Sequence, residues 1–314
     1  MIDVIIPAYN AHKTICETLF SIVMQSVRDK LNVYIVNDCS DTDYKKEVKK
    51  FSKVLNIKEV KTKKNSGPGV ARQLGIDSSC SPYIVFIDAD DVFYNYMSIE
   101  TLYNSITSRD CDIVSGTFIE EVDDIVYAHS NDEIWMHGKI YRRKFLEDNN
   151  IRFNDTYANE DAGFNNLAFF CTKLNTIDDV IYVWRCNKNS MTRSSEYNFW
   201  GIEGYTYNIC WAIKCGEERN ANVYKMAKLL YETMLEVYYR YVFFRKKEST
   251  VDDILKWSVD LKKYYLKYVD KLSPAVKEQC PLLIFENLYK TIGSSEVVLD
   301  NDLSFNQFVE MIKE

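Results

Sequence analysis

Long apolar runs and several common motifs are missing from this sequence of 314 residues. No run approaches the roughly 18–20 apolar residues of a membrane-spanning helix, so we predict no transmembrane segment. The nine cysteines are scattered and include no CxxC pair. They predict reduced thiols in a cytoplasmic protein, and neither a disulfide framework nor a zinc site. Walker A, GxGxxG and GxSxG motifs are also absent, and the 3 histidines lack the spacing of metal ligands.

An excess of positive charge is missing as well. The chain has 39 basic and 46 acidic side chains, which leaves a net charge of −7. Residues 1–199 hold 23 basic and 29 acidic side chains, and residues 200–314 hold 16 and 17. These totals imply no strongly basic face, so nucleic acid is not the expected partner, although a local basic patch stays open. The acidic excess lies in the front part, where carboxylates are available for chemistry.

Strand and helix patterns alternate over the first ninety residues. Apolar segments typical of buried strands lie at residues 2–7, 32–36, 57–60 and 83–87. Helical patterns lie between them at residues 14–25, 42–55 and 70–78. Repeated β-α-β units with short connections predict a mainly parallel α/β sheet with helices on both faces. A hairpin at 112–121 and 125–129, helices at 142–150 and 160–172 and a strand at 176–184 are expected to follow.

The pattern becomes helical from about residue 200. Apolar residues between Val223 and Tyr241 recur at spacings of three and four, which predicts a helix with one buried face. We therefore predict two domains, an α/β domain at 1–198 and a helical C-terminal region at 199–314. The second would pack on the first, add acceptor contacts or form a homo-oligomer. Residues 238–247 mix aromatic with basic side chains, which leaves peripheral membrane contact or contact with an extended acceptor open.

Three carboxylates, Asp88, Asp90 and Asp91, directly follow the apolar strand at 83–87. Ligands of such sheets bind beyond the carboxyl ends of the strands. Carboxylates crowded there repel one another unless a cation lies between them, and oxygen ligands at alternate positions suit Mg²⁺ or Mn²⁺. A solvated, aspartate-rich turn is the alternative.

Two further candidates follow the early strands. Asp38 comes after the strand at 32–36, where it either hydrogen-bonds a base or ribose or caps the next helix. Arg72 lies one turn beyond the glycine turn at 65–69. Its planar guanidinium suits a diphosphate, and an exposed surface arginine is the alternative.

The middle of the chain holds the remaining candidates. Glu160 and Asp161 open a predicted helix. Acidic residues at this position are either simply stabilised by the helix dipole or supply a general base. Arg185 and the polar segment 187–193 follow a strand and offer donors for a diphosphate, or form a plain loop. Trp135 either belongs to an acceptor wall or lies beside a basic helix start.

Together these segments resemble family 2 glycosyltransferases of the GT-A fold. The motifs stand in family order over about 195 residues, although each is weak alone. They are residues 5–10 (IIPAYN), 36–40 (VNDCS), 65–72 (NSGPGVAR), 86–91 (FIDADD) and 138–143 (GKIYRR), then Glu160 with Asp161, then Arg185 with Ser190. The helical tail lies outside the resemblance. Gln73 stands where the family usually has asparagine.

The resemblance implies a role for each matched residue. Nucleoside contacts would come from Pro7, Tyr9 and Asp38, the last with uracil if the donor is a UDP-sugar. Arg72 would help to place the nucleotide. The Asp88-Ala89-Asp90 motif would contact the ribose through Asp88 and bind the metal through its aspartates, chiefly Asp90. Asp161 would be the catalytic base, and Arg185 and Ser190 would line the diphosphate. No third protein ligand to the metal is assigned.

The reaction implied is transfer of a sugar from a nucleotide diphosphate to an acceptor hydroxyl, with inversion at the anomeric carbon. A nucleotidyltransferase and a non-catalytic module that binds sugar-nucleotides or glycans stay open as alternatives. The acceptor would be a cell-envelope glycan or, alternatively, a modified nucleobase in DNA. The overall acidity favours the glycan.

Overall fold

The computed structural model describes residues 1–122, 125–156, 158–185, 187, 197–244, 251–292 and 303–313. The chain divides into two compact units, Met1–Tyr197 and Asn198–Glu314. Each unit is described by itself below.

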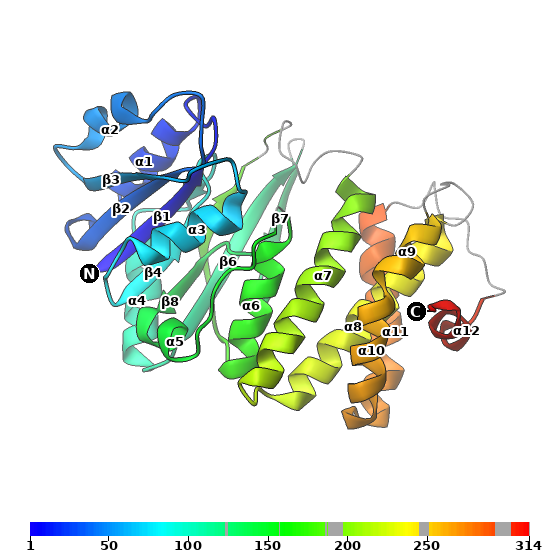
Figure 1. Cartoon of the computed structure of the whole chain (residues 1–314). Helices are drawn as coiled ribbons and strands as arrows, with labels where there is room; N and C mark the ends of the chain where they lie inside the picture. The colour runs from blue at the N-terminus through cyan, green and yellow to red at the C-terminus, as the bar shows by residue number, and fades with distance from the viewer. Residues whose placement is uncertain are drawn as a thin grey trace. The chain divides into compact units, whose positions relative to one another are not determined.

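The first unit is built on one nine-stranded sheet (Figure 1). Its strands, in spatial order, are β3 (Asn56–Lys61), β2 (Leu31–Asn37), β1 (Ile2–Ala8), β4 (Tyr83–Phe86), β8 (Lys139–Arg142), β6 (Ile113–Val122), β9 (Asn175–Trp184) and β5 (Val92–Phe93). The strand β7 (Ile125–His129) pairs with β6 as the expected hairpin. Strands β3, β2, β1 and β4 are parallel, as are β6 and β9. The other pairs are antiparallel, so the second half of the sheet is mixed.

Helices cover both faces of this sheet, as the buried strands predict. They are α1 (Ile15–Val23), α2 (Lys45–Phe51), α3 (Pro68–Asp77), α4 (Ser98–Ser108), α5 (Arg143–Asp148) and α6 (Glu160–Cys171), with a 3₁₀ turn at Arg28–Lys30. All seven residues of β1 are buried. Val4 and Ile6 belong to a core with α1 and α4. Ile5 points to the other face, where α3 packs so closely that a Cβ at Gly75 would lie 2.4 Å from Ile5 Cγ2.

The parallel register brings three strand ends to one edge. Ala8 of β1 pairs with Asn37 of β2, and Ile5 of β1 pairs with Phe86 of β4. The residues that follow these strands therefore meet at the carboxyl edge of the sheet, where ligands of such folds bind.

The second unit is helical, as predicted. It contains α7 (Tyr197–Glu218), which begins at the unit boundary, then α8 (Val223–Phe244), α9 (Val251–Trp257), α10 (Val259–Tyr268), α11 (Pro274–Ile292) and α12 (Phe305–Met311), with a 3₁₀ turn at Val269–Lys271. Met226, Leu230 and Met234 of α8 are buried where α8 packs against α10 and α11, so the apolar stripe is core. None of the described helices is long and apolar enough to cross a membrane.

Candidate active site

A cavity of about 610 Å³ lies at the carboxyl edge of the sheet. Seven residues predicted to bind donor or metal line it together with the predicted base: Pro7, Tyr9, Asp38, Arg72, Asp88, Ala89, Asp90 and Asp161. Residues far apart in the sequence, from β1 to the start of α6, thus share one space.

Asp38 is 3% exposed and holds the turn that precedes α3. Its carboxylate accepts hydrogen bonds from Thr62 Oγ1 at 2.7 Å, Ser66 N at 3.1 Å and Gly67 N at 2.8 Å. Gly67 has φ 87°, a conformation that glycine adopts readily. Asp38 does not cap α2, whose N-cap is Tyr44. The predicted contact of Asp38 with the nucleoside stays a prediction.

Arg72 joins two carboxylates inside the cavity wall. Nη2 lies 2.7 Å from Asp88 Oδ1, and Nη1 lies 2.6 Å from Glu160 Oε1. Arg72 is 4% exposed, so the alternative of a surface arginine is wrong. Burial by itself would raise the pKa of Asp88, but the nearby Arg72 and His137 together outweigh it, and the pKa of that carboxyl lies well below its usual range. Direct contact of Arg72 with the nucleotide remains a prediction.

Gly69 of α3 leaves the space that the Glu160 side chain occupies. A Cβ at this position would lie 2.5 Å from Glu160 Cγ and 2.9 Å from Glu160 Cβ. We expect Gly69→Ala to lower the free energy of unfolding by about 1–3 kcal/mol, because overpacking displaces the Glu160 carboxylate from Arg72. Urea unfolding of the variant and the parent chain measures this difference.

The control is the same substitution in a Glu160→Ala background. In that background Gly69→Ala should lower the free energy of unfolding by less, because the Cγ atom that the new methyl group would strike is gone. Equal costs in the two backgrounds would contradict the close packing of α3 on Glu160.

Asp161 lies in the first turn of α6, next to Glu160. The helix begins after Asn159, which has a left-handed φ of 57°. Burial raises the pKa of Asp161 above its usual value, and the nearby Arg72 opposes the shift only in part. Burial and the neighbouring Asp161 raise the pKa of Glu160 to about 7. A buried carboxyl with a raised pKa on a cavity wall has the properties of a general base.

The carboxylates after β4 fall into two environments. Asp91 is 1% exposed and accepts from the Tyr182 hydroxyl at 2.5 Å and from Arg185 N at 2.8 Å. Asp90 lines the cavity and accepts from Asn187 Nδ2 at 2.7 Å. Burial raises the pKa of both carboxyls. Asp91 therefore fixes the loop, and Asp90 faces the open space.

The donor set fits a divalent cation. Among the described residues, Asp88, Asp91 and His137 each offer a ligand atom, and these atoms all lie within 4.8 Å of one another. Asp90 adds a further carboxylate on the same cavity wall. Carboxylate oxygens are the ligands that Mg²⁺ and Mn²⁺ prefer, and their crowding favours a cation.

Two predicted diphosphate contacts stand apart from this set. The guanidinium of Arg185 forms an ion pair with Glu17, while its backbone N–H donates to Asp91. Arg185 is not among the residues that line the cavity. Ser190 lies outside the described residues. The roles of both remain predictions.

The family model of glycosyl transferase family 2 matches residues 3–159, half of the chain. The chain belongs to this family. The resemblance inferred from the motifs is thus confirmed. The helices that follow residue 159 lie outside the matched segment.

Bacterial glycosyltransferases are among the similar sequences. Poly(ribitol-phosphate) β-N-acetylglucosaminyltransferase TarS of Staphylococcus aureus is 27% identical over 216 residues, which cover 62% of this chain and 37% of TarS. Glycosyltransferase GlyA of Streptococcus pneumoniae is 27% identical over 228 residues, which cover 61% of this chain and 31% of GlyA. The matches therefore span about a third of the length of these relatives.

Solved structures of glycosyltransferases confirm the expected GT-A fold. S. aureus TarS 1–349 in complex with UDP has a TM-score of 0.69 at 20% identity, with 95% of this chain and 94% of that chain covered. The mannosyltransferase PcManGT of Pyrobaculum calidifontis, in complex with GDP-Man and Mn²⁺, has a TM-score of 0.53 at 16% identity, with 94% and 88% covered.

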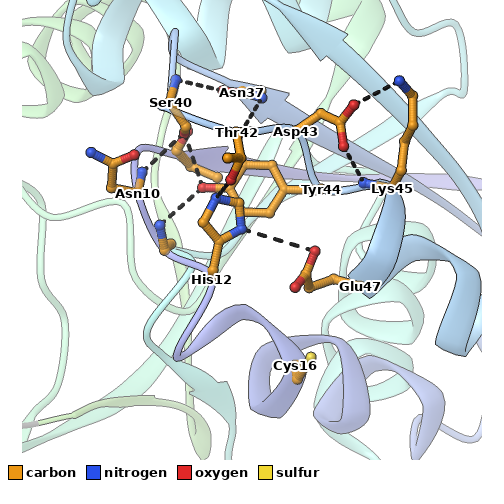
Figure 2. Close-up of polar contacts among 12 residues, drawn as sticks. Asn10, His12, Cys16, Asn37, Ser40, Thr42, Asp43, Tyr44, Lys45 and Glu47 are labelled. Carbon is orange, nitrogen blue, oxygen red and sulfur yellow. Dashed lines mark hydrogen bonds and ion pairs between the residues drawn. The ribbon is translucent and has the colours of Figure 1, made fainter.

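The wall of this glycosyltransferase cavity near Tyr9 is held by a polar cluster (Figure 2). The buried Tyr44 hydroxyl accepts from Ala11 N at 2.9 Å and lies 3.2 Å from Ser40 Oγ. His12 Nε2 lies 2.8 Å from Thr42 Oγ1. These bonds tie the loop after β1 to the loop after β2, so the residues that line the cavity after β1 are held in place.

Sequence reasoning missed two residues of the site. His137 and Trp184 line the cavity but carry no spacing that marks them in the sequence, whereas Asn187, which also lines it, belongs to the polar segment 187–193 that was expected there. His137 lies 3.8 Å from Asp88 through its Nε2, although 49 residues separate them. The pairing of β4, which precedes Asp88, with β8, which follows His137, brings the two near each other.

Proposed function

We propose that this chain is an inverting glycosyltransferase that transfers a sugar from a nucleotide diphosphate, most simply a UDP-sugar, to an acceptor hydroxyl. The observation that carries the proposal is that Asp161, Asp88 and Asp90 line one cavity. Solved complexes of TarS with UDP and with UDP-GlcNAc support a uridine donor. The name of that relative, which acts on poly(ribitol-phosphate), supports a cell-envelope polymer as acceptor.

The donor would lie along the carboxyl edge of the sheet. Pro7, Tyr9 and Asp38 would line the nucleoside end, and Arg72 would hold Asp88 toward the ribose. Asp88 and Asp90, with Asp91 or His137, would hold Mn²⁺ or Mg²⁺. When bound, such an ion supplies Lewis-acid stabilisation of the negative charge on the departing diphosphate.

Asp161 would act as the general base. Its carboxylate takes the proton of the acceptor hydroxyl as the oxygen attacks the anomeric carbon from the side opposite the nucleotide. The sugar–phosphate bond breaks in the same step, and the nucleoside diphosphate leaves with the bonding electrons. One base suffices, because inversion needs no covalent intermediate with the enzyme.

The activity should depend on pH through this base. Because burial raises the pKa of Asp161, kcat should fall toward acid at a pH above the ordinary value of 3.8. Protonation of the neighbouring Glu160, whose pKa is about 7, should also contribute to this fall of kcat toward acid pH. A profile of kcat from about pH 4 to 9 measures it. An acid limb that persists in Asp161→Asn would show that another group causes it.

A screen of nucleotide-sugars with Mn²⁺ tests the function. Release of UDP with transfer or hydrolysis of the sugar is the expected result. Release of pyrophosphate would identify a nucleotidyltransferase. Donor binding without turnover, whatever the acceptor, would identify a binding module. The family match favours the first outcome.

The two parts of the chain would have different roles. Residues 1–198 would form the catalytic domain in the cytoplasm. Residues 199–314 would add acceptor contacts, pack on that domain or form a homo-oligomer, and peripheral membrane contact stays open.

A further inference from the structure

Two tryptophans form an aromatic wall of the cavity. Trp135 and Trp184 both line it, with ring centroids 5.1 Å apart and planes tilted by 43°. Behind them His137 lies parallel to Trp135 at 5.9 Å and stacks on Tyr182 at 4.6 Å. Both tryptophans are half-buried and line the cavity. Aromatic walls with a few polar groups are typical of small-molecule sites.

Buried polar groups hold the loop that carries Trp135. Asp132 Oδ1 accepts from Ile134 N at 3.0 Å and Trp135 N at 2.7 Å. The fully buried Lys139 donates to Trp135 O at 2.5 Å and Asp132 Oδ1 at 3.2 Å. Asn165, also fully buried, donates to Ile134 O at 2.6 Å and Trp135 O at 3.1 Å. A buried lysine is costly unless it is paired, so these bonds preorganise the indole.

The order of the strands places this wall beyond the carboxylates. The nucleoside side of the proposed site lies at the ends of β2 and β1, and Asp88 and Asp90 follow β4. Trp135 precedes β8, and Trp184 ends β9, on the other half of the sheet. A donor that reaches from β2 to β4 therefore leaves the aromatic wall to the acceptor.

The charge of the cavity limits what the wall accepts. Acidic side chains dominate its lining: Asp38, Asp88, Asp90, Asp91, Glu160 and Asp161. The basic residues of the lining are Lys13, Arg72 and the ionisable His137, and Arg72 is already paired with two carboxylates. The lining therefore offers a polyanionic acceptor little attraction at this wall, whereas the apolar face of a neutral sugar ring would stack on an indole.

We propose that Trp135 and Trp184 form an acceptor subsite that stacks on the ring of a neutral cyclic sugar. This inference rests on the proposed glycosyltransferase function. The two tryptophans would determine acceptor specificity, and Lys139 and Asn165 would be positioning residues for Trp135.

Kinetics of tryptophan variants test the subsite. With octyl β-glucoside and octyl β-galactoside as acceptor probes, Trp135→Ala and Trp184→Ala should each raise the acceptor KM about tenfold. The donor KM and the rate of donor hydrolysis should change less than about twofold, since the wall does not touch the donor. Trp135→Phe keeps an aromatic face and leaves a smaller void than Trp135→Ala, so it should bring the acceptor KM back toward the parental value.

Fluorescence gives a readout that needs no turnover. Titration of the UDP-loaded chain with octyl β-glucoside should change the tryptophan emission. That change should be reduced in Trp135→Phe, lost in the double variant Trp135→Phe/Trp184→Phe, and kept in Trp257→Phe, a matched substitution in α9 of the second unit.

Three results would overturn the subsite. Trp135→Ala could raise the donor KM and leave the acceptor KM unchanged, the fluorescence change could survive in Trp135→Phe/Trp184→Phe, or poly(ribitol phosphate) could be the better acceptor in both the parent and Trp135→Ala. A parent chain that turns over no nucleotide-sugar would instead contradict the proposed function, and the titration would still decide whether the wall binds sugar.

Discussion

Asp161→Asn is expected to lower kcat by about 10²–10⁴-fold while UDP binding changes little. The amide has the size of the carboxylate but cannot accept the proton of the acceptor hydroxyl. Asp161 lies on the wall of the cavity. Among the described residues, Arg72 forms its ion pairs with Asp88 and Glu160 and not with Asp161. Initial rates of UDP release and calorimetric titration with UDP measure the two quantities.

Asp148→Asn is the matched control for this substitution. Asp148 ends α5 and forms an exposed ion pair with Lys144, which contributes little to stability, so its variant should keep the parental rate. Equal losses of UDP affinity and rate in Asp161→Asn would show that Asp161 shapes the donor site and is not the base.

Asp90→Asn is expected to remove most metal-dependent activity. A bound cation supplies several kcal/mol of stabilisation to the leaving diphosphate, which corresponds to a rate loss of about 10³-fold or more. Asp90 lines the cavity and accepts a hydrogen bond from Asn187, whereas the Asp91 carboxylate is buried and accepts from Tyr182 and from Arg185 N. The rate with Mn²⁺ and the Mn²⁺-induced rise of the melting temperature with UDP present both measure the loss.

His137→Gln separates the two candidate ligand sets. If Asp90 is the principal ligand, His137→Gln should keep much of the Mn²⁺-induced rise in melting temperature. The reverse result, in which His137→Gln loses this rise and Asp90→Asn keeps it, would assign the ion to Asp88, Asp91 and His137 and contradict the prediction for Asp90.

The elements of the first unit were predictable because their signals are local. The run of apolar residues in β1 is buried on both sides, and the apolar segment before Asp88 is β4. Parallel strands share their carboxyl edge, so the candidates after β1, β2 and β4 could be expected to meet. The stripe of α8 likewise follows from a helical period of 3.6 residues.

The partners of the charged groups were not predictable. Arg72 was expected to face a diphosphate or solvent, but it bridges two carboxylates, one of them 88 residues away. Arg185 pairs with Glu17, 168 residues away. A guanidinium pairs with whichever carboxylate the folded chain brings near it, and the sequence contains 46 acidic residues.

Local composition and motif order alone thus determined the α/β and helical parts, the family and the acidic edge of the sheet. The tertiary structure decided that His137 stands beside Asp88, that Trp135 and Trp184 share a wall, and that Glu160 holds Arg72. The physical reason is the range of the interactions. Strand and helix signals arise from neighbours within a few residues, whereas a site is assembled by packing between elements whose separation along the chain carries no pattern.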